Sequence, residues 1–277
     1  MLTLRQKYKS FGGFTEFYEH HSQVTNSKMR FSIYRPEKLL EDAPVLFWLS
    51  GLTCTDENFM QKAGAQKYLA DLGLVLVAPD TSPRGLGIAG EDDDWFFGSG
   101  AGFYVDATEE PWSHNYNMYS YVADELPKII SDAFQTNPKK QSIMGHSMGG
   151  HGALVVGLKN SENYRSISAF SPICAASSCD WGRHAFSKYL GSDQKAWKKY
   201  DASVILSKQN SILPILLDQG LDDEFLREGQ LMTQELQKLE KNHPIQINMR
   251  EGYDHSFYFI SSFIESHLRF HAEYLFL

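Results

Sequence analysis

The chain has 277 residues, of which 42% are hydrophobic, and its 34 acidic and 26 basic side chains give a formal charge of −8. This composition is typical of a folded globular protein and excludes a small disulfide scaffold or a disordered chain. The acidic balance argues against nucleic acid as a partner, because phosphate binding requires a basic stripe. It leaves room for basic sites that bind small anions.

Three cysteines, Cys54, Cys174 and Cys179, are few and odd in number, which is typical of a reducing compartment where thiols stay free. The first residues lack the apolar core of a signal peptide, and no window approaches the ~18 consecutive apolar residues of a membrane span. We therefore expect a cytoplasmic protein that does not bind a membrane.

The predicted elements begin with an antiparallel pair of strands, Phe14 to His21 and Met29 to Arg35. Later apolar runs are typical of strands that are covered on both faces. In chain order these runs are Val45 to Leu49, Leu74 to Ala78, Ser142 to Gly145, Ile167 to Phe170, Ile212 to Leu217 and Ile245 to Met249.

Helical periodicity occupies segments between and after these runs. Helices are expected over Asn58 to Leu72, Tyr119 to Phe134, Met148 to Leu158, Glu224 to Lys241 and Ser256 to Leu275. The last segment has an apolar stripe that predicts docking on the rest of the protein. The stripe consists of Ile260, Ile264, Leu268, His271 and Leu275.

The alternation of strands and helices predicts an α/β fold with a mostly parallel central sheet, antiparallel N-terminal strands and helices on both faces. No repeat or linker interrupts the pattern, so residues 1–277 are expected to form a single domain. Asp80 to Asn117 and Ser171 to Ala202, which contains Trp181, lack a long periodic segment. Both follow the carboxyl ends of predicted strands, where open α/β sheets bind ligands.

The strongest local pattern is Gly145-His146-Ser147-Met148-Gly149, between a predicted strand and a predicted helix. A serine at such a turn has a strained backbone that lifts its hydroxyl clear of the sheet. The pattern alone is weak in a chain with 21 glycines, but the flanking apolar strand and the small residues of the following helix favour a nucleophile. Ser147 is the candidate; the alternative is a glycine-rich turn with an exposed serine.

A serine nucleophile requires a base and an acid that orients it, which in α/β-hydrolases follow in the order Ser, Asp or Glu, His. His255 follows the last predicted strand and is the candidate base. Asp218, Asp222 and Asp223 follow the strand before it. Asp218 ends its strand, and the spacing does not separate Asp222 from Asp223.

The other histidines have ordinary structural interpretations. His146 precedes the nucleophile at a turn where that side chain is expected to point away, and His151, four residues after Ser147, is a candidate to line the site. His20 and His21 lie in the predicted hairpin, and His267 and His271 lie within the last helix.

An oxyanion hole in this architecture combines the backbone N–H of the residue after the nucleophile with one from the loop after an earlier strand. Met148 and Leu52 are the candidate donors, and Gly51 permits close approach of the backbone to a substrate. The alternative for the second loop is a tight strand-to-helix turn. Cysteine spacing and the acidic run Glu91 to Asp94 do not favour a metal site, so neither metal nor cofactor is expected.

Five blocks together resemble the S-formylglutathione hydrolase family, also called esterase D, in family order and across nearly the whole chain. The blocks are Trp48 to Thr55, Gly100 to Thr108, Gly145 to Leu154, Asp218 to Gly220 with Asp222-Asp223, and Glu251 to Ser256.

This resemblance implies an α/β-hydrolase fold and a cytosolic, commonly homodimeric serine thioesterase that converts S-formylglutathione to glutathione and formate in formaldehyde detoxification. It implies that Asp223 is the acid, that Leu52 and Met148 form the oxyanion hole, and that Cys54 lies near the site without being the nucleophile. Alternatives are a general short-chain carboxylesterase or acyltransferase on the same fold, and a binding module without catalysis.

Overall fold

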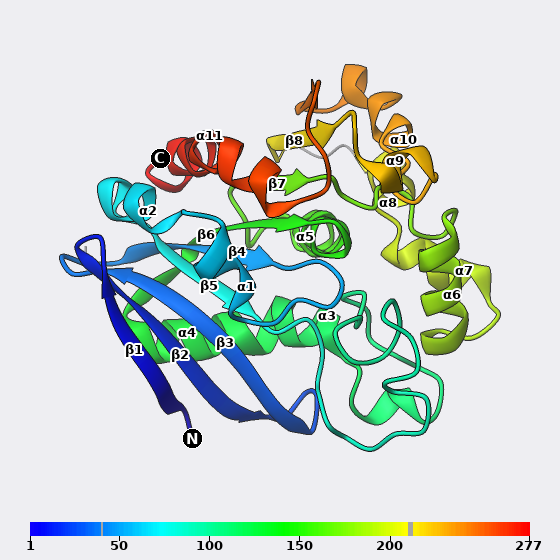
Figure 1. The fold of residues 1–277 in the computed structure, drawn as a ribbon, viewed down its shortest axis with the longest axis horizontal. Coiled ribbons are helices and arrows are strands. Elements are labelled where there is room, and N and C mark those ends of the chain that lie inside the picture. The colour runs from blue at the N-terminus through cyan, green and yellow to red at the C-terminus, as the bar shows by residue number, and fades with distance from the viewer. Residues whose placement is uncertain (40, 210–212) are drawn as a thin grey trace.

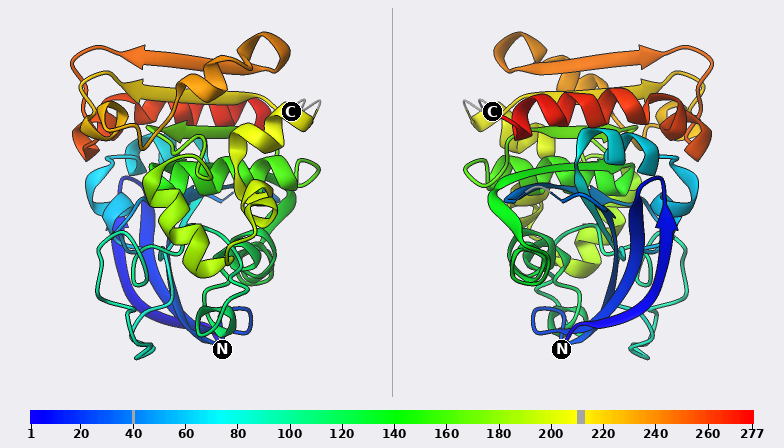
Figure 2. Two further views of the ribbon diagram at one scale, coloured as in Figure 1. Left: turned by 90° about the vertical axis from the view of Figure 1, so that its right-hand side faces the viewer. Right: turned by 90° about the vertical axis from the view of Figure 1, so that its left-hand side faces the viewer.

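In the computed structural model, which describes residues 1–39, 41–209 and 213–277, a nine-stranded sheet has the order β1-β2-β3-β5-β4-β6-β7-β8-β9 (Figure 1). The sheet is strongly twisted and runs from the blue N-terminal strands to the orange β9 (Figure 2). The strands are β1 Thr3–Ser10, β2 Gly13–Ser22, β3 Ser27–Pro36, β4 Ala43–Leu49, β5 Val75–Pro79, β6 Thr136–His146, β7 Ile167–Phe170, β8 Ile215–Gly220 and β9 Ile245–Arg250.

The pairing confirms a mostly parallel sheet with antiparallel N-terminal strands. Strands β1, β2 and β3 pair antiparallel, and β3 also pairs antiparallel with β5. Every pairing from β5 through β4 and β6 to β9 is parallel. The carboxyl ends of the parallel strands therefore meet at one edge of the sheet, where the loops that carry the predicted site residues emerge.

Helices cover both faces of the sheet, as predicted. The helices are α1 Asn58–Lys62, α2 Gln66–Leu72, α3 Met118–Ser120, α4 Leu126–Phe134, α5 Met148–Lys159, α6 Asp180–Tyr189, α7 Gln194–Trp197, α8 Ala202–Lys208, α9 Glu224–Arg227, α10 Gln234–Gln237 and α11 Phe257–Leu275. Alternate residues of β4 separate the two cores: Phe47 and Leu49 face α4 and α5, whereas Leu46 and Trp48 face α2 and α11. This alternation follows from the two-residue period of a strand.

The C-terminal helix docks on the sheet through the predicted stripe, whose members are all buried. Two histidines of this helix are also hydrogen-bonded to the sheet, because Nδ1 of His267 and Nε2 of His271 lie 2.9 Å and 2.8 Å from the hydroxyl of Ser168. Buried polar groups need such partners, and these contacts make both histidines part of the packed core. The helix begins directly after His255, with Ser256 as its N-cap.

Three predicted helices differ from the observed elements. Asn58 to Leu72 forms two helices, α1 and α2, because Gly64 between them has a φ of +67°. The expected helix Glu224 to Lys241 is wrong: the segment contains only α9, α10 and a 3-10 turn. Tyr119 to Phe134 is helical, but a π-helical turn at Tyr121–Glu125 separates α3 from α4.

Other elements lie outside the predictions. Strand β1 carries exposed side chains along almost its whole length, so it lacks the alternation that reveals a half-buried strand. Helices α6, α7 and α8 lie in the segment 171–202 or just after it. The predicted strand from Ile212 begins outside the described residues, and β8 begins at Ile215. No described helix has both the length and the apolar character needed to cross a membrane.

Candidate active site

Ser147 lies at the sharp turn between β6 and α5, with φ 58° and ψ −121°. This left-handed φ is strained for a residue with a side chain, and it is the conformation expected of a nucleophile elbow. The Ser147 N–H donates to the carbonyl of Phe170 at 3.0 Å. Crowding requires a glycine two residues later, because a Cβ at Gly149 would lie 2.0 Å from the carbonyl oxygen of Leu49.

His255 follows β9, and its Nδ1 lies 2.6 Å from Oδ2 of Asp223, which follows β8. Asp223 is buried, and its carboxylate also accepts from the backbone N–H of Phe225 at 2.9 Å and from the side chain of Gln219 at 3.3 Å. Burial alone would raise the pKa of Asp223, but the hydrogen bond and charge of His255 outweigh it and lower the pKa below its ordinary value. The carboxylate is therefore charged and holds the imidazole in one orientation.

The neighbouring acids have other environments. Asp218 lies in the core, where its carboxylate accepts from Asn248 at 2.7 Å and from Arg250 at 2.9 Å. Asp222 is exposed. Of the three candidate acids, Asp223 is the one whose carboxylate contacts His255.

The loop after β4 approaches Ser147 closely, since a Cβ added at Gly51 would lie 3.1 Å from Cβ of Ser147. Leu52 and Thr53 follow, and Thr53 has a φ of +67°. The N–H of Thr53 donates to the carbonyl of Gly100 at 3.0 Å. The strained loop is thus held in place by contacts from the segment that follows β5.

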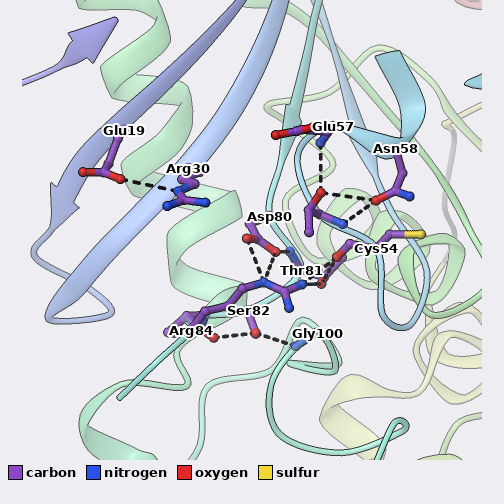
Figure 3. Close-up of polar contacts among 12 residues, drawn as sticks. Glu19, Arg30, Cys54, Glu57, Asn58, Asp80, Thr81, Ser82, Arg84 and Gly100 are labelled. Carbon is purple, nitrogen blue, oxygen red and sulfur yellow. Dashed lines mark hydrogen bonds and ion pairs between the residues drawn. The ribbon is translucent and has the colours of Figure 1, made fainter. Parts of the chain in front are cut away.

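Figure 3 shows the main anchor of this loop, the backbone carbonyl of Cys54. It accepts from the Thr81 hydroxyl at 2.6 Å and from Nη2 of Arg84 at 2.9 Å. The Nε of Arg84 contacts both carboxylate oxygens of Asp80, at 3.0 Å and 2.9 Å, and Asp80 is buried. Charged donors make strong hydrogen bonds, so this cluster fixes the backbone next to Leu52.

A cavity of about 340 Å³ joins these parts. Its volume is within the range of small-molecule sites. Trp95, Trp181 and Phe225 form an aromatic wall, with ring centroids 5.3 Å apart for the two tryptophans and 4.7 Å apart for Trp181 and Phe225. The described lining residues are Gly51, Leu52, Thr53, Cys54, Asn58, Lys62, Trp95, His146, Ser147, Trp181, Phe225, His255, Ser256 and Phe257.

Comparison with known proteins shows the family of the chain. The family model described as "Putative esterase" matches residues 22–270. S-formylglutathione hydrolase of Mus musculus is 53% identical over 271 residues, with 96% of each chain covered, and that of Arabidopsis thaliana is 49% identical, with 96% and 95% covered. The chain belongs to the S-formylglutathione hydrolase family.

A solved structure supports the same assignment and the α/β-hydrolase fold. The S-formylglutathione hydrolase from Agrobacterium tumefaciens superposes with a TM-score of 0.95 at 46% identity, covering 98% of this chain and 99% of that one. Members of this family are hydrolases, so the chain is an enzyme with hydrolase activity rather than a binding module.

Two histidines differ from the expectations. His146 does not point away from the site: it lines the cavity, and its ring centroid lies 4.4 Å from that of His255. Burial, together with the charge of His255, lowers the pKa of His146 well below its ordinary value, so the ring is neutral. His151 is buried away from the described cavity lining, with Nε2 3.1 Å from the carbonyl of Phe103, and burial lowers its pKa to about 4.

Cys54 and Trp181 line the cavity, as the resemblance and the loop prediction imply. Burial raises the pKa of the Cys54 thiol, so it is a weak nucleophile at neutral pH. The aromatic residues Trp95 and Phe225 were not among the predicted site residues. Trp95 lies in a long loop, and Phe225 follows Asp223 by two residues, which is the one sequence signal that would have indicated it.

Proposed function

We propose that the chain hydrolyses S-formylglutathione to glutathione and formate, with Ser147, His255 and Asp223 as its catalytic triad. The observation that carries the proposal is the 2.6 Å contact of His255 with a buried Asp223, beside a cavity that Ser147 and His255 both line. The relatives that cover nearly the whole chain are named for this reaction. The resemblance to the family implies that this reaction serves formaldehyde detoxification.

In the first half of the mechanism, Oγ of Ser147 attacks the formyl carbon while Nε2 of His255 takes its proton. Asp223 holds the opposite proton on Nδ1 and stabilises the imidazolium that forms. The backbone N–H groups of Leu52 and Met148 donate to the developing oxyanion. Removal of one such donor typically costs about 3 kcal/mol of transition-state stabilisation.

The tetrahedral intermediate then collapses, the carbon–sulfur bond breaks, and the departing glutathione sulfur takes the proton from His255, which returns to its neutral form. A formyl ester of Ser147 remains. His255 next removes a proton from water, the hydroxide attacks the formyl carbon, and Ser147 leaves with that proton. Formate is released and the free enzyme returns.

The ratio of kcat/KM for S-formylglutathione to kcat/KM for 4-nitrophenyl acetate tests the substrate. We expect the formyl thioester to be favoured by at least about 100-fold, since the thiolate is a good leaving group and the glutathione moiety adds binding energy. A preference for the aryl ester would instead favour a general carboxylesterase. Product analysis by formate release accompanies the assay.

A second candidate function is a side activity on short aryl esters, which the aromatic wall of the cavity favours. The cavity wall formed by Trp95, Trp181 and Phe225 is aromatic, and such a surface accepts an aryl leaving group without a specific charge contact. The same triad also serves acyl transfer if an alcohol replaces water. Methanol added to the assay tests this: transfer would produce methyl formate in place of formate.

We also propose that the enzyme is a cytoplasmic homodimer of single-domain protomers. Leu4, Tyr8 and Phe11 expose apolar side chains at the β1 edge of the sheet, which is a surface suited to a second copy. Cys54, Cys174 and Cys179 are free thiols, which suits a reducing compartment. Sedimentation equilibrium should give twice the 31.5 kDa mass of one chain, and a mass of one chain would contradict the dimer.

A further inference from the structure

Lys62 is the one formally charged side chain, the histidines aside, among the described residues that line the catalytic cavity. It ends α1, and its Nζ lies 5.5 Å from the ring centroid of Phe257. Within residues 1–39, 41–209 and 213–277, no carboxylate oxygen lies within 4.0 Å of this ammonium group. The cation at the mouth of the site is thus available to a ligand.

The surroundings of the cavity differ in charge from one side to the other. On the Lys62 side it continues into a second hollow of about 650 Å³, which shares Lys62, Ser256 and Phe257 with it and adds Tyr258 and Ser261. On the other side of His255 lies a hollow whose walls include three carboxylates and one arginine, namely Asp222, Glu224, Asp254 and Arg227. An anionic ligand is therefore repelled from one side and attracted to the other.

The start of α11 lies between the two sides. Ser256 caps this helix, which is 19 residues long, and lines the cavity and both hollows. The carboxylate of Asp254 accepts from the backbone N–H of Ser256 at 3.0 Å and from its hydroxyl at 2.6 Å, so it offsets the positive end of the helix. Lys62 therefore makes the second hollow the electropositive exit from Ser147.

The charges of glutathione decide which group fits there. Its γ-glutamyl carboxylate lies next to its own ammonium group, whereas the glycyl carboxylate has no partner in the molecule. We propose that Lys62 binds this glycyl carboxylate and so selects glutathione thioesters; the inference rests on the proposed function. The formyl group then lies at Ser147, and the glycyl end extends along Phe257 towards Tyr258.

Other basic side chains near the site are already engaged. Arg84 is held by Asp80 and the Cys54 carbonyl, and its role is in the oxyanion loop. Arg183 pairs with Asp180 at 2.6 Å. Lys188 lies over the ring of Phe97 at 4.4 Å and does not belong to the described cavity lining.

The test compares two substrates that differ only in the glycyl carboxylate: S-formylglutathione and its glycyl monoethyl ester. For Lys62→Met we expect KM for S-formylglutathione to rise about fivefold with kcat unchanged, as for the loss of one exposed ion pair. With the monoethyl ester the substitution should leave KM within twofold of the wild-type value, a change too small for a lost ion pair. Lys62→Glu should raise KM for S-formylglutathione further.

Two control variants accompany the test. Lys67→Met, at an exposed position on α2, makes the same change in net charge away from the cavity and should leave KM unchanged. Lys62→Arg keeps the charge and should restore most of the affinity. Equal effects of Lys62→Met and Lys67→Met would overturn the proposal, because they would indicate a general effect of net charge.

The assays distinguish a failure of the proposed function from a failure of the Lys62 assignment. If the wild-type enzyme hydrolyses S-formylglutathione poorly, the proposed function fails whatever Lys62 does. If the wild-type enzyme is efficient but Lys62→Met leaves KM unchanged, or raises it equally for the monoethyl ester, only the assignment of Lys62 is overturned. An increase confined to the substrate with a free glycyl carboxylate supports it.

Discussion

The carboxylate of Asp223 lies 2.6 Å from Nδ1 of His255, while Asp222, its neighbour in the chain, is exposed to solvent. Asp223 also receives the backbone N–H of Phe225 and the side chain of Gln219, so its orientation is fixed from several directions. Adjacent residues in the chain therefore differ in role: Asp223 positions the base, and Asp222 faces water.

The first prediction concerns this pair of acids. Asp223→Asn should lower kcat about 10³- to 10⁴-fold, because an amide cannot hold the required imidazole tautomer or stabilise its charged form. Asp222→Asn, the matched control, should retain kcat within about twofold, as exposed substitutions usually have small effects. The measurement is kcat for S-formylglutathione with both variants. Similar losses in the two would show that the acid has been assigned wrongly.

The second prediction concerns the support of the oxyanion loop. Arg84→Met removes the charged donor to the Cys54 carbonyl and leaves the buried Asp80 without its charged partner. We expect kcat to fall about tenfold with little change in KM, and the free energy of unfolding to fall by about 2 to 3 kcal/mol. Kinetics and urea unfolding measure both, and Arg84→Lys should recover part of each.

Arg269→Met is the control for Arg84. Arg269 forms an exposed pair with Glu265 on α11, and exposed pairs contribute little to stability. This variant should match the wild-type enzyme in kcat and in the free energy of unfolding. An Arg84→Met variant with unchanged kcat would mean that the loop keeps its shape without that donor.

The third prediction concerns Cys54. Its role in the loop is carried by its backbone carbonyl, so Cys54→Ala should retain nearly full activity. N-ethylmaleimide should inactivate the wild-type enzyme by filling the cavity, and should not inactivate Cys54→Ala. Because burial raises the thiol pKa, the rate of inactivation should continue to increase with pH up to and beyond 9.0, the ordinary pKa.

Cys174 and Cys179 are buried and should not react. Mass spectrometry of the modified protein should therefore find one adduct, on Cys54. Complete loss of activity in Cys54→Ala would favour a cysteine mechanism over a serine one.

The fourth prediction concerns the buried acid Asp56, close to the same loop. It is 2% exposed, and its Oδ2 has no hydrogen-bond partner in the part of the chain that the structure describes. Burial, with the charges of Asp80 and Glu57, raises its pKa from 3.8 to about 7. Between these values the folded state keeps a proton that the unfolded state releases, so this group makes stability fall as pH rises.

Asp56→Asn removes that dependence. The free energy of unfolding of the variant minus that of the wild-type protein should therefore be larger at pH 8 than at pH 5, because only the wild-type protein loses this contribution as pH rises. Urea unfolding at the two pH values measures the difference. The same difference between the two proteins at both pH values would show that Asp56 does not titrate in this range.

The sequence predicts the sheet better than the segments that join it. Strands such as β4 and β7 are continuous apolar runs, so burial on both faces leaves a direct signal. β1 leaves none, because it pairs through its backbone at an edge while its side chains face solvent. The apolar period of Asn58 to Leu72 continues across Gly64 in the sequence, but the backbone turns at Gly64 and divides the segment into two helices.

In the candidate site, too, residues that directly follow strands could be predicted, whereas those placed by loop turns and packing could not. Ser147 and His255 follow strands directly, so their positions at one sheet edge could be predicted from the order of the elements. The choice between Asp222 and Asp223 depends on a turn of the backbone that spacing does not encode. The turn predicts that His146 points away from the site, yet the packing of its ring against His255 depends on the loop after β9, which is distant in sequence.

The most direct test of the central claim is the activity of Ser147→Ala on S-formylglutathione. This variant should lose at least about 10⁴-fold in kcat, since a nucleophile has no substitute in the triad. Its circular dichroism spectrum and melting temperature should match those of the wild-type enzyme. A folded Ser147→Ala variant that still releases formate at the wild-type rate would contradict the account.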